Sequence, residues 1–578
     1  MTESYYTMSD ADDTIIVDTS LSANMATLAM VTVPSERQFP PPTLAFSAIK
    51  ARDFQSRAPK SYWDAKKSPT WEQWKPAFEK QMNDLYTRHT WDLVYPPPNA
   101  HILPGKWVLD VKFNADATWD RNRARWVVCG NFENSESWAA QDIYAAVANG
   151  ATIRLFFALV AIHDYECYQF DIVTAFLNAP CNGDIYVEQP HGFSDGTKRV
   201  CKLIRALYGL RKVPQWWFET ISKALKEYGF EPMAADLCFF RHPALDVLLI
   251  LYVDDLLIAA SSTNKIDQIR TMLSSLFELK EFGEVKEFLS ISVIRNRDNR
   301  QIFLHQKAFT DRIIERFGYS DLHPVSTPWN HQIQLPGQWE KLTESSQFYS
   351  QHTGSTNYLS CHTRPDITYT SNRLASANSG PSPIYWKVLQ HLFRYLVGTR
   401  DLGILLGGKY DPLDIHLKAY CDAAFADELV SRYSTAGHVI FVAGGPIYWT
   451  SKRQTLVTLS TTEAEFINLT PTGCSILWIK ALLEELGYSQ IAPQLLFTDS
   501  ANAMAIALNP FEKQRTRHID IRYKWVIDKV AKGEFVIQHV DTKNQIADGL
   551  TKGLQKESHA NFVRFLNMTT LGQFENTL

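Results

Sequence analysis

The chain has 578 residues, of which 45% are hydrophobic and 21% charged, and its formal net charge is -4. This composition excludes a disordered protein, and the length predicts about three or four domains. The slightly acidic balance also excludes a uniformly basic surface, so any bound nucleic acid must meet local basic patches.

The cysteines and the apolar runs indicate the cellular setting. The 8 cysteines form no C-x-x-C pair and no zinc-binding spacing with histidine, which indicates a reducing compartment and no structural zinc. No apolar run reaches the roughly 18 residues that span a bilayer, and the acidic start "MTESYYTMSDADDT" lacks the parts of a signal peptide. We expect a soluble, intracellular protein with no membrane partner.

The first predicted regions are a tail and a mixed helix-and-strand domain. Residues 1–57 are rich in Ser, Thr, Asp and Pro and show no periodicity, which predicts a mobile tail. From residue 58 an amphipathic helix leads to a strand, and residues 105–132 alternate as a hairpin would. The hairpin carries the basic side chains Lys106, Lys112, Arg121, Arg123 and Arg125. We place the first globular region over residues 58–300.

Two adjacent acids interrupt apolar sequence within this region. Asp254 and Asp255 separate "LLILYV" from "LLIAA", a pattern that predicts strand, tight turn and strand with the acids at the tip. A solvated hairpin turn explains the pair, and so does a cation site, because two buried like charges repel each other unless a cation offsets them. The local pattern leaves both readings open.

A third acid favours the cation site. Asp171 ends the apolar strand in "YECYQFDIVTAF". A sheet that sets this strand beside the strands flanking Asp254 and Asp255 would bring the three acids together. Three carboxylates suit two Mg²⁺ ions, or Mn²⁺ in their place. Two such ions stabilise the attacking and the leaving oxygen of a phosphoryl transfer.

The later part of the chain repeats this theme. Residues 301–412 are predicted to be largely helical. A new alternation starts near residue 413, and we place a further domain over residues 413–556. Residues 557–578 are predicted to form a C-terminal tail. This last domain offers four acids on predicted strands and helices: Asp422, Glu463, Asp499 and Asp548. Each alone reads as a surface acid, whereas together they offer oxygen ligands for two Mg²⁺ ions.

The segments "FDIVTAFLNA", "ALYGLRKVPQWW" and "LYVDDLLIA", in this order, resemble the reverse transcriptase of copia-type long-terminal-repeat retrotransposons. "KWVLDVKFN", "RARWVVCGNF" and "TRPDITY" extend the resemblance, which covers roughly residues 58–556. It implies a mixed α+β and α/β multidomain fold: a right-hand polymerase of fingers and palm (58–300), thumb and connection (301–412), then a ribonuclease H-like domain (413–556).

The resemblance also implies roles for single residues of the polymerase. Asp171, Asp254 and Asp255 would hold the catalytic metals and align the primer 3′-hydroxyl. The nucleotide and template would be bound by Arg123, Arg125, Phe176, Gly209, Pro214, Tyr252 and Val253. For Arg123 and Arg125 the alternative is a solvated strand face. For Phe176, which would lie against the sugar 2′ position, the alternative is an ordinary core aromatic.

The four later acids resemble the Asp-Glu-Asp-Asp set of ribonuclease H. The resemblance makes Asp422, Glu463, Asp499 and Asp548 the ligands of two Mg²⁺ ions that activate water against an RNA phosphodiester. His539 lies near the place of a mobile histidine that assists product release in that family. A surface histidine without a role is the alternative.

The implied function is an RNA-directed DNA polymerase with ribonuclease H activity. Its expected partners are an RNA template, a DNA primer, the RNA–DNA hybrid and deoxynucleoside triphosphates, together with integrase and capsid proteins of the element encoded elsewhere. We expect it in the cytoplasm, within a virus-like particle if the element is intact, or in the nucleus. The alternatives are a decayed or host-adopted remnant that only binds nucleic acid, and an unrelated metal-dependent nuclease.

Overall fold

The computed structural model describes residues 58–113, 119–134, 146–333, 346–410, 415–428, 431–508 and 520–578. The tail predicted for residues 1–57 lies outside these ranges. The chain divides into two compact units, the first made of residues 1–147 and 179–218, the second of residues 148–178 and 219–578. The chain therefore passes from the first unit into the second at residue 148, returns to the first at residue 179, and enters the second again at residue 219.

The first unit combines two helices with two small sheets. One sheet has the order β1-β7-β6-β2, and the other is the hairpin β3-β4. The described elements are α3 (Tyr62–Lys67), α4 (Trp71–Thr87), β1 (Trp91–Val94), β2 (Ile102–Leu103), β3 (Gly105–Phe113), β4 (Trp119–Val128), η1 (Gly130–Phe132), β6 (Tyr186–Val187) and β7 (Val200–Leu203). The hairpin predicted over residues 105–132 is confirmed.

Alternation along β4 separates a buried face from a basic one. Ala124, Trp126 and Val128 are buried, so the side chains between them lie on the other face of the strand. Trp126 is paired with Trp107 of β3, and their ring centroids lie 5.4 Å apart. Phe78 of α4 packs edge-on against Trp107 at 4.8 Å. This aromatic core fixes the hairpin and its basic face.

The second unit begins with a sheet, here termed the palm sheet, whose order is β12-β5-β11-β10-β9-β8. Helix α5 is buried along nearly its whole length because "GATIRLFFALVAIH" is largely apolar; its buried Arg154 donates hydrogen bonds to backbone carbonyls. The elements are α5 (Gly150–His163), β5 (Glu166–Ile172), η4 (Ala175–Asn178), α6 (Val213–Glu227, which starts in the first unit), β8 (Glu231–Pro232), β9 (Phe239–His242), β10 (Val247–Tyr252), β11 (Asp255–Ala260), α7 (Thr263–Leu276) and β12 (Leu279–Glu284).

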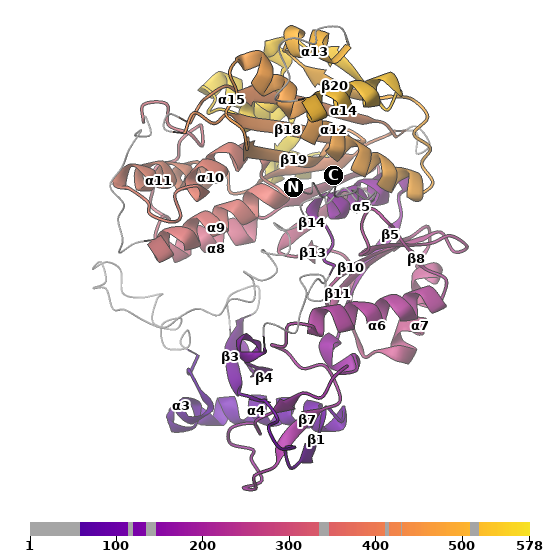
Figure 1. Ribbon diagram of the computed structural model, residues 1–578, viewed down its shortest axis with the longest axis vertical. Helices are drawn as coiled ribbons and strands as arrows, with labels where there is room; N and C mark the ends of the chain where they lie inside the picture. Colours follow the sequence, from indigo (N-terminus) through magenta and orange to yellow (C-terminus); the bar gives the residue numbers. More distant parts are fainter. Residues whose placement is uncertain are drawn as a thin grey trace, which may run out of the picture. The chain divides into compact units, whose positions relative to one another are not determined.

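A second sheet in this unit has the order β13-β14-β15-β16-β22 and is accompanied by a layer of helices (Figure 1). The helices enclose a core of buried residues that includes Tyr349, Leu392 and Phe393. The elements are β13 (Glu287–Phe288), β14 (Ile291–Asn296), β15 (Gln301–His305), α8 (Lys307–Arg316), α9 (Ser346–His362), η5 (Pro365–Ile367), α10 (Thr368–Ala375), α11 (Pro383–Gly398) and β16 (Leu402–Gly407).

The C-terminal tail predicted over residues 557–578 is wrong. This segment forms α15 (Lys556–Phe565), β22 (Met568–Thr570) and α16 (Leu571–Glu575). Strand β22 pairs with β16, and Phe574 stacks on Phe303 of β15 with ring centroids 5.2 Å apart. The segment is ordered because its apolar side chains complete a sheet whose other strands lie far earlier in the chain.

The last sheet, here termed the C-terminal sheet, has the order β19-β18-β17-β20-β21. Strands β17, β20 and β21 run parallel to one another, so their carboxyl ends meet at one edge. The elements are β17 (Leu417–Ala424), β18 (Thr435–Val442), β19 (Gly445–Arg453), α12 (Thr461–Glu485), β20 (Gln494–Thr498), α13 (Ala501–Leu508), α14 (Asp520–Ala531), β21 (Phe535–His539), η7 (Thr542–Asn544) and η8 (Ile546–Leu550).

Helix α12 (Thr461–Glu485) is long and apolar enough to cross a membrane by length and composition, and 56% of its most apolar window is buried. Its residues Ala464, Phe466, Leu469 and Ile476 are buried within the unit, and the helix lies against β17. We therefore assign α12 as a core helix. The mixed α/β, multidomain architecture expected from the sequence is confirmed.

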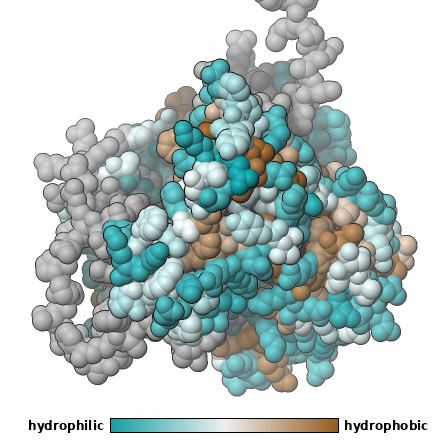
Figure 2. Space-filling view, turned by 90° about the horizontal axis from the view of Figure 1, so that it is seen from below, coloured by the Kyte–Doolittle hydropathy of each residue, from teal (hydrophilic) through white to brown (hydrophobic). Residues whose placement is uncertain are grey.

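Figure 2 shows a face on which hydrophilic residues predominate and hydrophobic residues form small, interrupted patches. Scattered exposed apolar residues are normal on folded proteins.

Candidate active sites

The palm sheet sets two of the three predicted acids side by side. Strands β5 and β11 pair with Asp171 opposite Asp255, and β11 pairs with β10 with Asp255 opposite Tyr252. Residues directly opposite each other in antiparallel strands project to the same face. Asp171, Asp255 and Tyr252 therefore form a row across one face of the sheet.

The third acid lies in the turn between β10 and β11. Val253 has φ 59°, a left-handed conformation that is strained for a β-branched residue. The carbonyl of Asp254 accepts a hydrogen bond of 2.8 Å from the Ile172 backbone N–H. This bond ties the turn to the end of β5, so Asp254 is held next to the strand that carries Asp171.

Mutual repulsion characterises this group, here termed the palm site (Asp171, Asp254 and Asp255). Burial raises the pKa of the Asp255 carboxyl to about 7, and the charges of Asp254 and Asp171 add to the rise. The three carboxylates share one end of the sheet. Unlike a second group of acids described below, their oxygens do not all lie within 4.8 Å of one another. A cation between them would offset the repulsion.

Sequence reasoning missed Lys280, which extends the row of acids. Strand β12 pairs with β5 with Lys280 opposite Asp171, and the Lys280 ammonium lies 4.5 Å from the centroid of the Phe282 ring. The segment "LKEFGE" shows no alternation of apolar and polar residues, so no local pattern indicates which strand lies beside it. Only the strand order places this cation beside the palm site.

The predicted basic residues of the first unit lie on the β3-β4 hairpin. Arg123 and Arg125 alternate with buried residues and so share one face. The Arg125 guanidinium lies 5.5 Å from the centroid of the Tyr208 ring, and Arg123 is paired with Asp110 on β3. The hairpin thus presents two guanidinium groups on the face opposite its aromatic core.

The segment that follows β7 contains Gly209, which packs against this hairpin, and Pro214. The Val128 backbone N–H donates a 2.8 Å hydrogen bond to the Tyr208 carbonyl. Gly209 has φ 102°, and a Cβ there would lie 1.9 Å from the Val128 carbonyl oxygen. Pro214 lies in the first turn of α6, where no intrahelical N–H is needed. Glycine is therefore required for the close approach of the two segments.

We expect Gly209→Ala to destabilise the protein by about 2–5 kcal/mol, because the substitution combines a disfavoured φ with steric overlap. The control is Gly196→Ala: Gly196 also has a positive φ, 75°, but nothing lies within 4 Å of its Cβ position. That change should cost about 1 kcal/mol. Denaturant unfolding of both variants measures the difference, and equal costs would contradict the close approach.

Phe176, the predicted sugar contact, lies in η4 just after β5. Its side chain is 3% exposed. Thr174, two residues earlier, has φ 52°, so the chain turns sharply between Asp171 and this ring. The position beside the palm site agrees with a sugar contact and the burial with a core aromatic, so the role of Phe176 stays a prediction.

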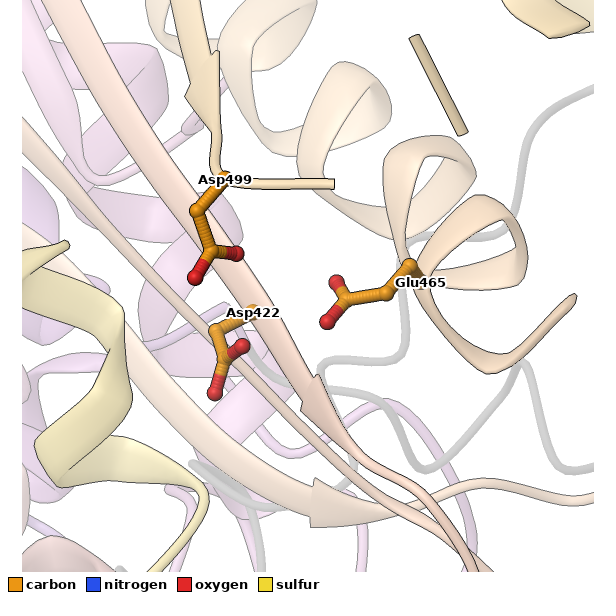
Figure 3. Close-up of side chains that lie close together, drawn as sticks. All are labelled: Asp422, Glu465 and Asp499. Atoms are coloured by element: carbon orange, nitrogen blue, oxygen red, sulfur yellow. The ribbon is translucent and has the colours of Figure 1, made fainter. Parts of the chain in front are cut away.

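A second group of acids lies at the edge of the C-terminal sheet. Asp422 is on β17, Asp499 directly follows β20, and Glu465 is on α12. One ligand oxygen from each of the three lies within 4.8 Å of the others. Figure 3 shows Glu465 pointing from its helix toward the two aspartates. We term this group, Asp422, Glu465 and Asp499, the C-terminal site.

The structure corrects the predicted glutamate: Glu465, and not Glu463, joins the aspartates. Glu463 stands in the first turn of α12, where its N–H donates to the Ser460 hydroxyl (3.2 Å) and its carboxylate accepts from the Leu459 N–H (2.7 Å). This is a capping arrangement that serves the helix. The pattern S-T-T-E in "LSTTEAEF" is itself a capping signal, and it could have identified Glu463 as the cap and Glu465 as the inward acid.

The C-terminal site has the properties of a cation site. Glu465 is 9% exposed, and its buried Oε2 has no hydrogen-bond partner. Burial raises the pKa of the Glu465 carboxyl well above its usual range, and the charges of Asp422 and Asp499 raise it further. Hard divalent cations take such carboxylate oxygens, so a Mg²⁺-like ion fits this set.

Neighbouring side chains hold the two aspartates in place. The Thr551 hydroxyl donates to Asp422 Oδ2, and the Thr542 hydroxyl donates to Asp499 Oδ2 over 2.9 Å. Asn468, one turn beyond Glu465 on α12, donates to the Asp422 carbonyl over 2.8 Å. Strand and helix are therefore tied together directly behind the site.

The two remaining predicted residues lie beside this group. Asp548 is in η8, where burial and then the charge of Asp422 raise the pKa of its carboxyl. It lies outside the group whose oxygens approach within 4.8 Å. His539 ends β21 opposite Thr498, the residue before Asp499, and its side chain is exposed. The prediction for His539 is untested.

Comparisons with known proteins agree on one family. The sequence profile described as "Reverse transcriptase (RNA-dependent DNA polymerase)" matches residues 88–331. The retrovirus-related Pol polyprotein from transposon TNT 1-94 of Nicotiana tabacum is 33% identical over 507 residues, which are 86% of this chain and 38% of that protein. The Pol polyprotein from transposon RE1 of Arabidopsis thaliana is 32% identical over 504 residues, 86% of this chain and 34% of that protein.

The chain thus spans little more than a third of the length of these relatives. Among solved structures, a foamy viral protease-reverse transcriptase in complex with double-stranded DNA aligns with 81% of this chain and 70% of that chain. Its TM-score is 0.44 and its sequence identity 12%, and this likeness supports no conclusion about activity.

Proposed function

Because the chain belongs to the reverse transcriptase family of copia-type retrotransposon Pol polyproteins, we propose that it is an RNA-directed DNA polymerase that also has ribonuclease H activity. One observation carries the proposal: the palm sheet pairs Asp171 with Asp255 and ties the Asp254 turn to the same strand end. A chain of this family would need that arrangement to add nucleotides.

In the proposed polymerase reaction, Asp171, Asp254 and Asp255 hold two Mg²⁺ ions, or Mn²⁺ in their place. Bound there, the ions would offset the negative charge of the phosphates and stabilise the attacking oxygen of the primer as it loses its proton. The protein's own task is positioning: the palm sheet fixes the acids in a row, and the strained turn at Val253 keeps Asp254 at the strand end. Lys280, opposite Asp171, adds a positive charge on the face where a triphosphate would bind.

For the nucleotide and template we propose Arg123, Arg125, Gly209, Pro214, Phe176, Tyr252 and Val253 as contacts. The arginines offer charge-assisted hydrogen bonds to phosphate. Tyr252 lies in the row with Asp255, which favours a role next to the metals.

In the proposed ribonuclease H reaction, Asp422, Glu465 and Asp499, with Asp548 beside them, hold Mg²⁺ and orient water toward an RNA phosphodiester. Glu465 supports this assignment because a cation would contact its buried Oε2, which has no hydrogen-bond partner, and would offset the repulsion among the three acids. His539, exposed at the end of β21, is proposed to assist product release.

The proposed substrates are a primed RNA template, deoxynucleoside triphosphates and the RNA strand of the resulting RNA–DNA hybrid. Binding should rest on phosphate contacts and weaken as salt rises. Integrase and capsid proteins of the element are proposed partners. We place the protein in the cytoplasm, within a virus-like particle, with the nucleus as the alternative.

The test is extension of a 5′-labelled DNA primer on an RNA template by the purified 578-residue chain with Mg²⁺. We expect full-length DNA that requires all four deoxynucleotides and disappears when a chelator is added. A protein that binds the primer–template but neither extends it nor cleaves a hybrid would be the non-catalytic remnant instead.

We expect Phe176→Val to admit ribonucleotides, because a smaller side chain removes the overlap that would exclude a 2′-hydroxyl. The ratio of incorporation efficiencies for one deoxynucleotide and its ribonucleotide should fall by roughly tenfold or more. If the ring only fills the core, both nucleotides should suffer together, since truncating a buried Phe to Ala costs about 3–5 kcal/mol and to Val somewhat less. An unchanged ratio with a lower melting temperature would assign Phe176 to the core.

A further inference from the structure

The segment Asp548–Lys552 brings a positive charge into the C-terminal site. Lys552 Nζ lies 2.9 Å from Asp548 Oδ1, and the Asp548 side chain is 16% exposed. Lys552 and Asp548 are four residues apart, and the Lys552 backbone N–H also donates to the Asp548 carbonyl over 3.2 Å. The ammonium is thus held over the acid by one short turn of chain.

The same turn is fastened to the other ligands. Thr551, adjacent to Lys552, is fully buried, and its hydroxyl donates both to Asp422 Oδ2 and to the Asp548 carbonyl, the latter over 3.1 Å. The backbone of Lys552 is therefore held by the site, while its side chain, 49% exposed, reaches Asp548 from the solvent side.

The four acids of this region differ in their surroundings: three lie close together, and the fourth, Asp548, forms an ion pair with Lys552. Oxygens of Asp422, Glu465 and Asp499 lie within 4.8 Å of one another, and Glu465 Oε2 has no hydrogen-bond partner. Asp548 lies outside that group, and its Oδ1 makes no hydrogen bond either, but this atom differs from Glu465 Oε2 in that the Lys552 ammonium lies 2.9 Å from it. Three neighbouring carboxylates attract a divalent cation strongly, whereas a carboxylate that is already paired with an ammonium attracts a divalent cation much less.

We propose that Lys552 takes the place of a second divalent cation at Asp548, so that the free protein binds one divalent ion tightly at the C-terminal site and a second only weakly. The proposal rests on the ribonuclease H function proposed above. Lys552 is here a positioning residue: it restrains Asp548 and sets the number of resident ions.

The experiment is calorimetric titration of the full chain with Mn²⁺, in a background that carries Asp171→Asn and Asp254→Asn to remove ion binding at the palm site. The parent should bind one ion at the C-terminal site. Lys552→Met, which keeps the side-chain length and removes the charge, should bind a second ion at least about tenfold more tightly than the parent does. Adding Asp548→Asn to Lys552→Met should abolish that gain.

The matched control is Lys532→Met. Lys532, which directly follows α14, forms an ion pair of the same spacing and length with Asp528 of that helix, 2.9 Å, at a place that we assign to no site. This variant should titrate like the parent, and Lys552→Arg, which keeps a positive charge, should do so as well. Thermal denaturation confirms that each variant is folded.

Identical ion numbers and affinities in the parent and Lys552→Met would overturn the proposal, as would a gain that survives Asp548→Asn. If Asp422→Asn removes no ion from the parent, there is no cation site here and the proposal also fails. Hybrid cleavage measured on the same proteins separates the two claims. A parent that binds one ion and cleaves no hybrid would refute the ribonuclease H activity and leave the role of Lys552 standing.

Discussion

We expect Glu465→Gln to lower the proposed cleavage of an RNA–DNA hybrid by on the order of a hundredfold or more, whereas Glu463→Gln should leave it within a few fold. The reason is position: Glu465 contributes an unpartnered oxygen to the group with Asp422 and Asp499, while Glu463 caps its own helix. Removing one ligand charge weakens metal-assisted hydrolysis directly. The measurement is the initial rate of cleavage of a labelled hybrid at saturating Mg²⁺.

The two glutamates form a matched pair, since they stand two residues apart on one helix and receive the same substitution. Glu463→Gln should lower the free energy of unfolding by about 1 kcal/mol or less, because Gln keeps part of the capping contact. Glu465→Gln should leave stability unchanged or improve it, since the amide replaces a carboxyl whose ionised form is disfavoured by burial and by the charges of Asp422 and Asp499. A larger loss of cleavage with Glu463→Gln than with Glu465→Gln would refute the assignment.

The two proposed activities separate by single substitutions. Asp171→Asn or Asp254→Asn should reduce primer extension by on the order of a thousandfold while hybrid cleavage continues, and Asp422→Asn should do the reverse, because each change removes charge from one metal site only. Primer extension and hybrid cleavage are measured on the same preparations. A chelator should abolish both, and restoration by Zn²⁺ in place of Mg²⁺ would contradict the all-oxygen ligand sets.

Substitution is the right tool for this separation because the palm sheet and the C-terminal sheet are packed together in the second unit. The buried Arg154 of α5 donates to the Ile447 carbonyl on β19 over 2.6 Å, and the Trp478 indole of α12 donates to the Ala235 carbonyl over 2.8 Å. Cutting the chain between the sheets would leave these buried groups unpaired. Loss of extension in Asp422→Asn with cleavage intact would show that the two sites have been assigned the wrong way round.

Local patterns in the sequence predicted much of the palm sheet and of the β3-β4 hairpin. "LLILYVDDLLIAA" forms two strands that are buried except at the residues next to the acidic turn that joins them, as its flanking apolar runs indicated. The basic hairpin over residues 105–132 formed because its alternation buries one face, including Trp126, and leaves Arg123 and Arg125 on the other. Such elements are decided by the periodicity of neighbouring residues, which a single sequence displays in full.

Other features depended on which distant segments meet. The choice between Glu463 and Glu465 required the direction in which α12 presents each side chain to β17, although the capping pattern held a clue. The ordered end of the chain was missed because β22 has only three residues, and its partner β16 lies far earlier in the sequence. A strand of three residues is too short to show an alternating pattern, so whether it forms depends on a sheet edge that another part of the chain provides.

The sequence by itself determined the kinds of chemistry present: acids at the ends of apolar strands, basic residues on a hairpin, and the order of the motifs. Only the tertiary structure decided which charges become neighbours. Lys280 lies beside Asp171 through the strand order of the palm sheet, and the turn that holds Lys552 over Asp548 is fastened to Asp422 through Thr551. The physical reason is that electrostatic interactions act over a few ångströms in space, and strand register, which long-range packing sets, fixes those distances.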